Sequence, residues 1–114
     1  MTIMHSVQGR VVRVVLKGDL DLKTADPLRD ALNKLLDRYR DCDLLLDLSE
    51  VQFVDSSGLG VLLGRYRRLS AQGRGMSLVG VRPGVKTILE LAGIDSIMKV
   101  NQSVRGRHEP AAPK

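Results

Sequence analysis

The sequence predicts a single α/β domain, with a mixed β-sheet that begins as an N-terminal hairpin and continues with alternating helices. Two observations lead to this fold class. The chain opens with two short segments typical of strands, the second of them rich in β-branched residues, with a short turn between them. Helical spacings then alternate with short apolar runs. At 114 residues there is room for one hydrophobic core, and no internal repeat divides the chain. Where consecutive strands run parallel, we expect right-handed crossovers through the helices.

The N-terminal part is expected to fold as a hairpin, a loop and a first helix. Two strands, joined by a turn at Gln8-Gly9, are predicted over Ile3–Val7 and Val11–Leu16. Residues 18–21, Gly-Asp-Leu-Asp, interrupt the strand pattern and predict a loop. Thr24 is then a suitable N-cap for a helix with Pro27 in its first turn and an end near residues 40–43. The apolar face of this helix consists of leucines at helical spacing, namely Leu28, Leu32, Leu35 and Leu36.

The middle of the chain predicts a buried strand that leads into a second helix. Leu44–Leu48 is a short apolar run with polar flanks, which favours a central strand parallel to its neighbour. Residues 51–54 lead into Asp55-Ser56-Ser57-Gly58, which is expected to open the second helix. The predicted inward stripe of this helix consists of Leu59, Leu62, Leu63, Tyr66 and Leu69. The positions predicted to point outward are Val61, Arg65 and Arg68.

The C-terminal part predicts one more helix between two strands. Its features are a helix end at Gly73–Gly75, a strand over Met76–Val81, a helix from Pro83 through Leu91 capped by Gly93, and a last strand over Ile97–Val100. We therefore expect the domain to span residues 1–101. Residues 102–114 are basic, contain proline and lack periodicity, which predicts a flexible tail.

Composition limits the classes of function. The net charge is +5, but part of the excess lies in the tail, and aromatic residues make up only 3% of the chain. Because aromatic residues are so scarce, stacking on single-stranded nucleic acid is disfavoured, and we expect no nucleic-acid partner. Cys42 is the only cysteine, which excludes an internal disulfide and fits a reducing compartment. No apolar stretch approaches the length of a membrane span and no signal-peptide pattern opens the chain, so we expect a cytoplasmic protein without membrane attachment.

The residues that could take part in catalysis do not form a known catalytic motif. A nucleophile at Ser56 or Ser57 needs a base, but the two histidines, at positions 5 and 108, belong to no catalytic pattern. Neither a Gly-x-Ser-x-Gly elbow nor a glycine-rich phosphate loop is found. Aspartates in loops before helices are more often caps than Mg²⁺ ligands or acid–base groups, and this applies to Asp19, Asp21 and Asp55. We therefore expect no enzymatic activity, no cofactor and no metal.

The segment Ser56-Ser57-Gly58 at a helix start has two interpretations. Serine is a preferred N-cap and needs no further reason to be there. Alternatively, the free N–H groups and the positive end of the helix dipole can carry a phosphate without unfolding the helix. Gly58, Gly60 and Gly64 leave a similar choice: they keep the backbone around the serines accessible, or they allow close packing at a cost of up to about 1 kcal/mol each in helix propensity.

Residues 51–67, Val-Gln-Phe-Val-Asp-Ser-Ser-Gly-Leu-Gly-Val-Leu-Leu-Gly-Arg-Tyr-Arg, resemble the signature of STAS domains. They are most similar to anti-anti-sigma factors of the SpoIIAA type. The resemblance covers the chain from Ile3 to about Val100, because weaker matches follow in the right order and spacing. These are Gly-Asp-Leu-Asp at 18–21 with Thr24-Ala25, Leu-Asp-Leu-Ser at 46–49, and Leu78-Val-Gly followed by Pro83, Val85 and Gly93. The family usually ends in a further helix, of which residues 101–114 show little.

The resemblance implies an anti-sigma factor antagonist that works by switching partners. In such a cycle the unphosphorylated antagonist binds an anti-sigma factor that is also an ATP-dependent serine kinase, and this frees a sigma factor. The kinase phosphorylates the serine that follows the motif aspartate, here Ser56, and the product dissociates. A serine phosphatase resets the cycle. The implied contact surface includes Asp19, Asp21, Asp55, Ser57, Gly58, Leu59 and Gly60.

Other features of the resemblance leave alternatives open. Val61, Arg65 and Arg68 could meet an acidic face of the kinase, or they could form an ordinary solvated face. The expected target is a sporulation sigma factor, and the free antagonist is expected to be a monomer. The alternative function keeps the fold but changes the role, to a STAS module that acts as a scaffold or binds a small ligand without cycling phosphate.

Overall fold

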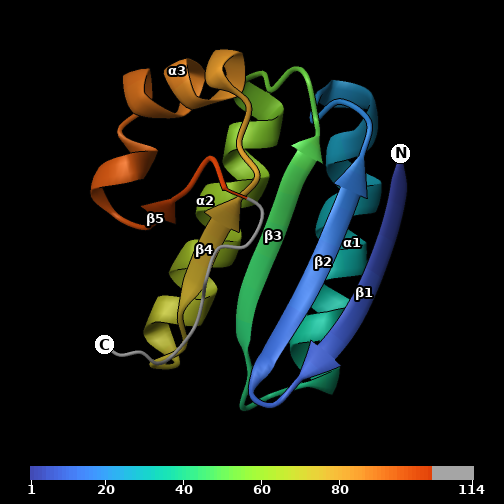
Figure 1. The fold of residues 1–114 in the computed structure, drawn as a ribbon. Helices are drawn as coiled ribbons and strands as arrows, with labels where there is room; N and C mark the ends of the chain where they lie inside the picture. The colour runs from blue at the N-terminus through green and yellow to red at the C-terminus, as the bar shows by residue number, and fades with distance from the viewer. Residues whose placement is uncertain (104–114) are drawn as a thin grey trace.

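A five-stranded mixed sheet forms the centre of the computed structural model, which describes residues 1–103 (Figure 1). The strands lie side by side in their order along the chain: β1 (Thr2–Gln8), β2 (Val11–Lys17), β3 (Asp43–Glu50), β4 (Met76–Val79) and β5 (Lys99–Val100). The helices of the described part are α1 (Leu22–Arg38), α2 (Ser56–Ala71), α3 (Pro83–Leu91) and the short 3₁₀ helix η1 (Ile94–Ser96). The predicted fold class is confirmed. No helix within residues 1–103 is long and apolar enough to span a membrane.

The sheet is mixed because only its first pair of strands is antiparallel. β1 and β2 form the predicted hairpin, with Gln8 opposite Val11 and Gly9 at a φ of 61° in the turn. The pairs β2–β3, β3–β4 and β4–β5 are all parallel. The central strand β3 is buried on both faces, as its apolar run predicts, and even Asp47 in its middle is only 4% exposed. Asp47 is neutralised there by Arg13 of β2, whose Nη2 lies 2.8 Å from the carboxylate.

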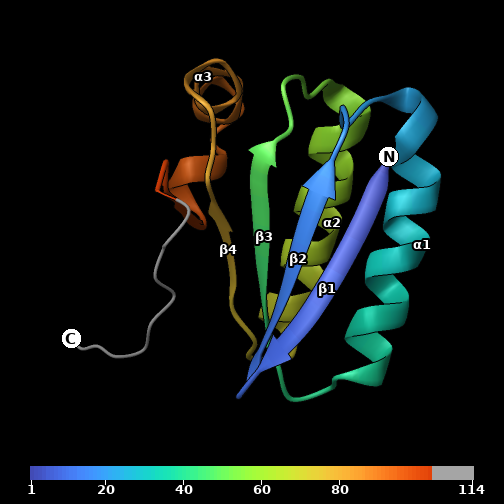
Figure 2. The same ribbon diagram turned by 45° about the vertical axis from the view of Figure 1, so that its right-hand side comes forward.

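Helices α1 and α2 cover the same face of the sheet, behind it in Figure 1, and α3 lies beyond the end of β4 (Figures 1 and 2). The core between helices and sheet is built from leucine and valine, as the scarcity of aromatic residues requires. Its completely buried members include Val12, Val14 and Leu16 of β2, Leu44, Leu46 and Leu48 of β3, and Leu28, Leu32 and Leu36 of α1. Burial of such side chains contributes about 1.5 to 3 kcal/mol each, which makes this layer the main source of stability.

The start of α1 differs from the prediction, because Asp21 and not Thr24 is the N-cap. The Asp21 carboxylate accepts hydrogen bonds from the backbone N–H groups of Lys23 and Thr24 at 3.0 and 3.2 Å. The Thr24 hydroxyl accepts in return from the Asp21 N–H at 3.0 Å, which completes a capping box. Since the helix begins at Leu22, Pro27 lies in the second turn and not the first.

The orientation of α2 also differs from the prediction. Val61 was expected to point outward, but its side chain is only 3% exposed and belongs to the core. The fully or almost fully buried positions are Gly58, Val61, Leu62 and Leu69, whereas Leu59, Leu63 and Tyr66 are partly buried. α2 lies on one face of the sheet and also contacts α1, so two directions of the helix are covered.

The C-terminal elements are partly as predicted. α3 spans Pro83–Leu91 as expected, and Gly93 follows it in the left-handed region with a φ of 77°. β4 ends earlier than predicted. β5 is shorter than predicted because the N–H groups of Ile97 and Met98 donate to the Ile94 carbonyl, in the turn that follows η1. Beyond β5 the chain stays beside β4, since the Gly80 N–H donates to the Ser103 carbonyl at 3.1 Å. The predicted tail lies outside the described residues from position 104 onward.

Candidate functional site

Two loops that the sequence singled out lie side by side where β2 and β3 end. The Leu20 N–H donates to the Phe53 carbonyl at 2.9 Å, and the Asp55 N–H donates to the Leu20 carbonyl at 3.0 Å. Leu20 itself is fully buried and forms an isolated parallel bridge with Val54. The segments 18–21 and 55–58 therefore form one continuous surface element.

Gly58 fixes the start of α2 against this loop. A Cβ atom on Gly58 would lie 2.4 Å from the Leu20 carbonyl oxygen and 2.7 Å from the Leu20 Cβ. Both distances are far below van der Waals contact, so no other residue fits without moving the backbone. The glycine of the Asp-Ser-Ser-Gly motif thus has a structural reason: it lets α2 begin in direct contact with the neighbouring loop.

The N-cap of α2 is Asp55, so the interpretation in which a serine caps this helix is wrong. Asp55 has an extended φ of −106°, and its Oδ1 accepts from the N–H groups of Ser57 and Gly58 at 2.8 and 3.1 Å. Ser56 is the first residue of the helix and is exposed, and Ser57 is half-buried. Because Asp55 does the capping, the Ser56 hydroxyl is left accessible at the positive end of the helix dipole.

The surroundings of Ser56 are partly acidic and partly apolar. Asp19 is exposed, and its carbonyl oxygen accepts from the Thr24 hydroxyl at 2.7 Å, which ties this loop to α1. Asp21 and Asp55 serve as caps, as the sequence reasoning considered most common. Sequence reasoning missed two exposed apolar side chains next to these caps, Leu22 at 77% and Phe53 at 47% exposure. Phe53 directly precedes the buried Val54, and Leu22 lies two positions after the buried Leu20, so the sequence pattern alone does not mark either side chain as exposed.

The outward face of α2 carries glycines that pack against nothing. A Cβ atom on Gly60 or Gly64 would meet no atom within 4 Å among the described residues. The alternative that these glycines allow close packing inside the domain is therefore wrong, and they leave an open, low surface along the helix that begins with Ser56. On the side toward α1, Arg68 donates to Asn33 Oδ1 at 3.2 Å and forms an ion pair with Asp37.

The side chain of Arg65 is half-buried and lies near two other arginines. Burial lowers the pKa of Arg65 below its ordinary value, and the charges of Arg29 and Arg68 lower it further. The lowered pKa reflects an unfavourable environment for a positive charge. The guanidinium group remains protonated at neutral pH.

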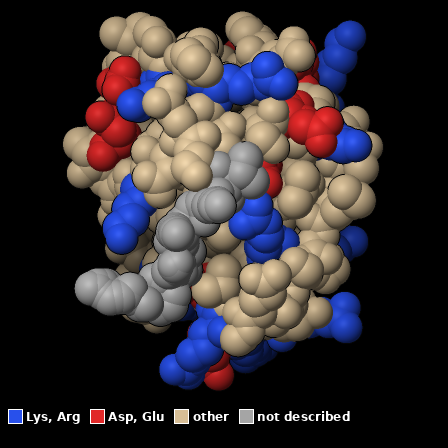
Figure 3. All heavy atoms as spheres, in the orientation of Figure 1, with Lys and Arg blue, Asp and Glu red and all other residues tan. Residues whose placement is uncertain are grey.

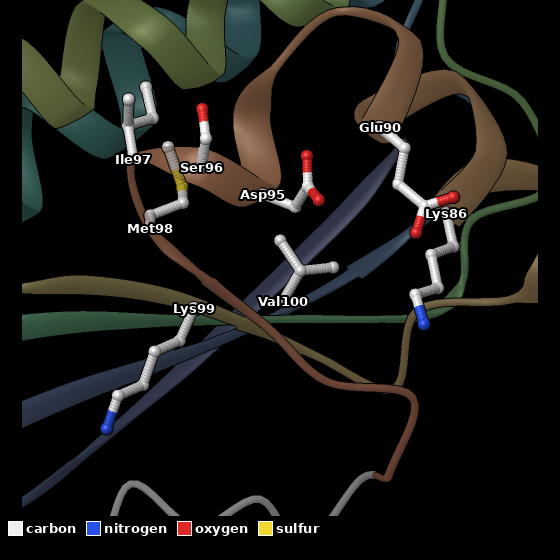
Figure 4. Close-up of a pocket in the computed structure, with 8 residues that line it drawn as sticks. All are labelled: Lys86, Glu90, Asp95, Ser96, Ile97, Met98, Lys99 and Val100. Atoms are coloured by element: carbon white, nitrogen blue, oxygen red, sulfur yellow. The ribbon is translucent and has the colours of Figure 1, made fainter.

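An open cavity of about 500 Å³ lies between α3, η1 and β5 (Figure 4). Its charged lining is of both signs, with Lys86 and Glu90 from α3, Asp95 from η1 and Lys99 from β5. The lining contains no histidine or cysteine, and the Ser96 hydroxyl already donates to the Gly93 carbonyl at 2.7 Å. Within residues 1–103, no group of three or more His, Cys, Asp or Glu side chains is placed to hold a metal ion.

Charged side chains are dispersed on the face of the molecule shown in Figure 3, which is the face turned away from α1 and α2. Basic and acidic groups lie there in small separate clusters with uncharged surface between them. Among residues 1–103, the part of this face that is visible in Figure 3 carries basic groups interrupted by uncharged surface, unlike the continuous basic stripe that follows a nucleic-acid backbone.

Comparison with known proteins gives the family. The model of the STAS domain matches residues 2–106. The chain belongs to the STAS domain family. A relative named "Anti-sigma F factor antagonist" from Paenibacillus polymyxa is 40% identical over 91 residues, which cover 79% of this chain and 77% of the relative.

Solved structures of STAS proteins share the fold. The anti-sigma factor antagonist SpoIIAA in its unphosphorylated form superposes with a TM-score of 0.74 at 24% identity, covering 87% of each chain. The Bacillus cell fate determinant SpoIIAA in its phosphorylated form gives a TM-score of 0.67 at 23% identity, covering 87% of this STAS domain and 90% of that chain.

Proposed function

We propose that this STAS domain is an anti-sigma factor antagonist whose binding is switched by phosphorylation of Ser56. In its unphosphorylated form it binds an anti-sigma factor that is also a serine kinase, which frees the sigma factor. Phosphate on Ser56 releases the antagonist, and a serine phosphatase restores it. The observation that carries the proposal is the exposed Ser56 at the first position of α2, free of the capping role that Asp55 fulfils. The name of the Paenibacillus relative supports the class of partner.

Phosphorylation at this position should leave the fold intact. A phosphate adds about −1.5 to −2 charges at pH 7, and the positive helix end stabilises such a charge by about 0.3 to 1 kcal/mol at an exposed site. The Asp55 carboxylate already accepts from the N–H groups of Ser57 and Gly58, so the phosphate gains the dipole interaction but also meets a neighbouring negative charge. These two effects oppose each other, and we expect a change in stability of at most about 1 kcal/mol.

In the complex the same phosphate is unfavourable. Ser56 lies on the surface that docks, so its phosphate must be buried against the kinase. An imperfectly paired buried charge costs several kcal/mol, and each 1.4 kcal/mol lowers affinity about tenfold. Release of the partner therefore outweighs any local stabilisation of α2.

The proposed contact residues differ in exposure, and we therefore propose different roles for them. Asp19, Leu59, Gly60 and Ser57 are exposed or half-exposed and can touch a partner directly. The remaining residues near the switch shape the surface from within: Asp21 and Asp55 as caps, and Gly58 and Val61 as buried packing positions. Arg65 and Arg68 belong to the side of α2 that faces α1.

The cellular setting follows from the same proposal. We propose that the antagonist acts in the cytoplasm, as a monomer when free, on a sporulation sigma factor. The resemblance to the sporulation antagonists of the SpoIIAA type supports this pathway. In this role the protein is the acceptor of a phosphate and catalyses no reaction itself.

The test is phosphorylation by the anti-sigma factor kinase of the same host with ATP, followed by intact-mass measurement and peptide mapping. We expect one added phosphate, located on Ser56. Ser56→Ala should abolish labelling, whereas Ser57→Ala should keep it at a similar or lower rate. Phosphate mapped to Ser57, or full labelling of Ser56→Ala, would show that the acceptor is assigned wrongly.

A further inference from the structure

The interface between α1 and α2 contains three arginine side chains in different surroundings. Arg29 of α1 forms an ion pair with Asp26 in the same helix. Arg68 of α2 donates to Asn33 and forms an ion pair with Asp37, both on α1. These two guanidinium groups therefore have acceptors within the chain.

Arg65 has none of these partners. Its Nε and Nη1 atoms are buried, and neither has a hydrogen-bond acceptor among residues 1–103. Burial lowers the pKa of Arg65, and the positive charges of Arg29 and Arg68 lower it further. Buried donors without acceptors are rare in native proteins because they lose their hydration and gain nothing in return. Arg65 thus lowers the stability of the protein in the absence of a partner. Buried polar groups without hydrogen-bond partners are typical of functional positions.

We propose that Arg65 pairs with a carboxylate side chain of the anti-sigma factor when the complex forms, so that its donors gain the acceptor that they lack in the free protein. The inference rests on the proposed function and identifies one contact in it. Arg65 lies nine residues after Ser56 on the same helix, which is about 13 Å along the axis and about half a turn around it. A partner that contacts both residues must therefore cover the start of α2 and also its side toward α1. An interface of standard size covers about 800 Å² on each partner, roughly 30 Å across, which is wide enough for both.

Arg65 is better suited to this role than Arg68. When the Arg65 side chain rotates out toward a partner, its Nε and Nη1 give up no hydrogen bond and the group moves away from two like charges. Arg68 would have to break its contacts with Asn33 and Asp37 to do the same. The planar guanidinium matches the two oxygens of a carboxylate, which makes an aspartate or glutamate the fitting acceptor. The open space around Gly64, next to Arg65, lets a partner approach the helix closely.

The experiment compares Arg65→Met with Arg10→Met in the full chain. Arg10 is exposed in the turn between β1 and β2, at the opposite end of β2 from the loop 18–21, so its variant removes the same charge far from the proposed docking surface. Calorimetric titration with the host's anti-sigma factor measures affinity, and thermal melting measures stability. We expect Arg65→Met to bind at least tenfold more weakly and to melt at the same or a higher temperature than the wild type. Arg10→Met should bind within about twofold of the wild type.

Each other outcome contradicts the inference. Equal affinity of Arg65→Met and the wild type overturns it and leaves the proposed function intact. Equal weakening by both variants shows an effect of net charge alone. A melting temperature of Arg65→Met several degrees below the wild type shows that Arg65 supports the fold instead. If the unmodified wild type binds no anti-sigma factor, the proposed function fails as well.

Discussion

Replacement of Gly58 by alanine should separate the start of α2 from the loop beside it. The added Cβ would lie 2.4 Å from the Leu20 carbonyl oxygen, and a backbone atom cannot move aside as a flexible side chain would. Overpacking of this kind costs about 1 to 3 kcal/mol. The shift also weakens the two hydrogen bonds that join Leu20 to Phe53 and Asp55, at about 0.5 to 1.5 kcal/mol each. Since alanine regains about 1 kcal/mol of helix propensity, we expect a net loss of about 1 to 5 kcal/mol.

Gly60→Ala is the matched control, because a Cβ at Gly60 meets no atom within 4 Å. This variant should be more stable than the wild type by about 0.5 to 1 kcal/mol, as expected for a glycine in an exposed helix interior. Urea unfolding followed by circular dichroism measures both free energies of unfolding. The reasoning is refuted if the two variants change stability in the same direction, or if Gly58→Ala is as stable as the wild type.

Two further predictions concern aspartates that the structure places in defined roles. Asp55→Ala should lower stability by about 0.5 to 2 kcal/mol because α2 loses its N-cap, whereas Asp55→Asn should stay within a few tenths of a kcal/mol of the wild type. Thermal melting distinguishes the two variants. Equal melting temperatures of the wild type and both variants would contradict the capping role. Arg13→Met leaves the Asp47 carboxylate, whose side chain is only 6% exposed, without its ion-pair partner, although the Ser49 N–H still donates to it at 2.9 Å. We expect the free energy of unfolding in urea to fall by about 1 to 3 kcal/mol. This is less than for a fully enclosed pair because the Arg13 side chain is 24% exposed. An unchanged free energy of unfolding would show that the ion pair is dispensable.

The sequence predicts most of the architecture because its periodic patterns are strong. The β-branched run of β2 and the short, polar-flanked apolar run of β3 favour strands. Pro83 and Gly93 mark the two ends of α3, and the bounds of α3 agree with the prediction. Helix starts are less predictable where several capping residues are close together. Asp21 and Thr24 can both cap a helix, and only the extended backbone at Asp21, with a φ of −136°, decides between them.

Side-chain environments depend on packing that a single helix does not encode. The apolar spacing of α2 is compatible with more than one inward face. In the structure α2 contacts α1, and the Val61 side chain belongs to the core. The buried Arg74 has no sequence signal at all. Its guanidinium donates to the carbonyls of Tyr39 and Cys42 at 2.7 Å each and so closes the end of α1, a contact between residues more than thirty positions apart. Likewise, only the three-dimensional structure reveals that Nε and Nη1 of Arg65 are buried without a hydrogen-bond acceptor among residues 1–103.

The central claim is that phosphate on Ser56 controls binding and leaves the fold unchanged. The most direct measurement is a titration of the anti-sigma factor with unmodified and phosphorylated antagonist, with melting curves of both forms. We expect the phosphorylated form to bind at least about a hundredfold more weakly, since a poorly paired buried charge costs several kcal/mol. Its melting temperature should lie within about 4 °C of the unmodified form. Equal affinity of the two forms, or a phosphorylated form that melts many degrees lower, would contradict the account.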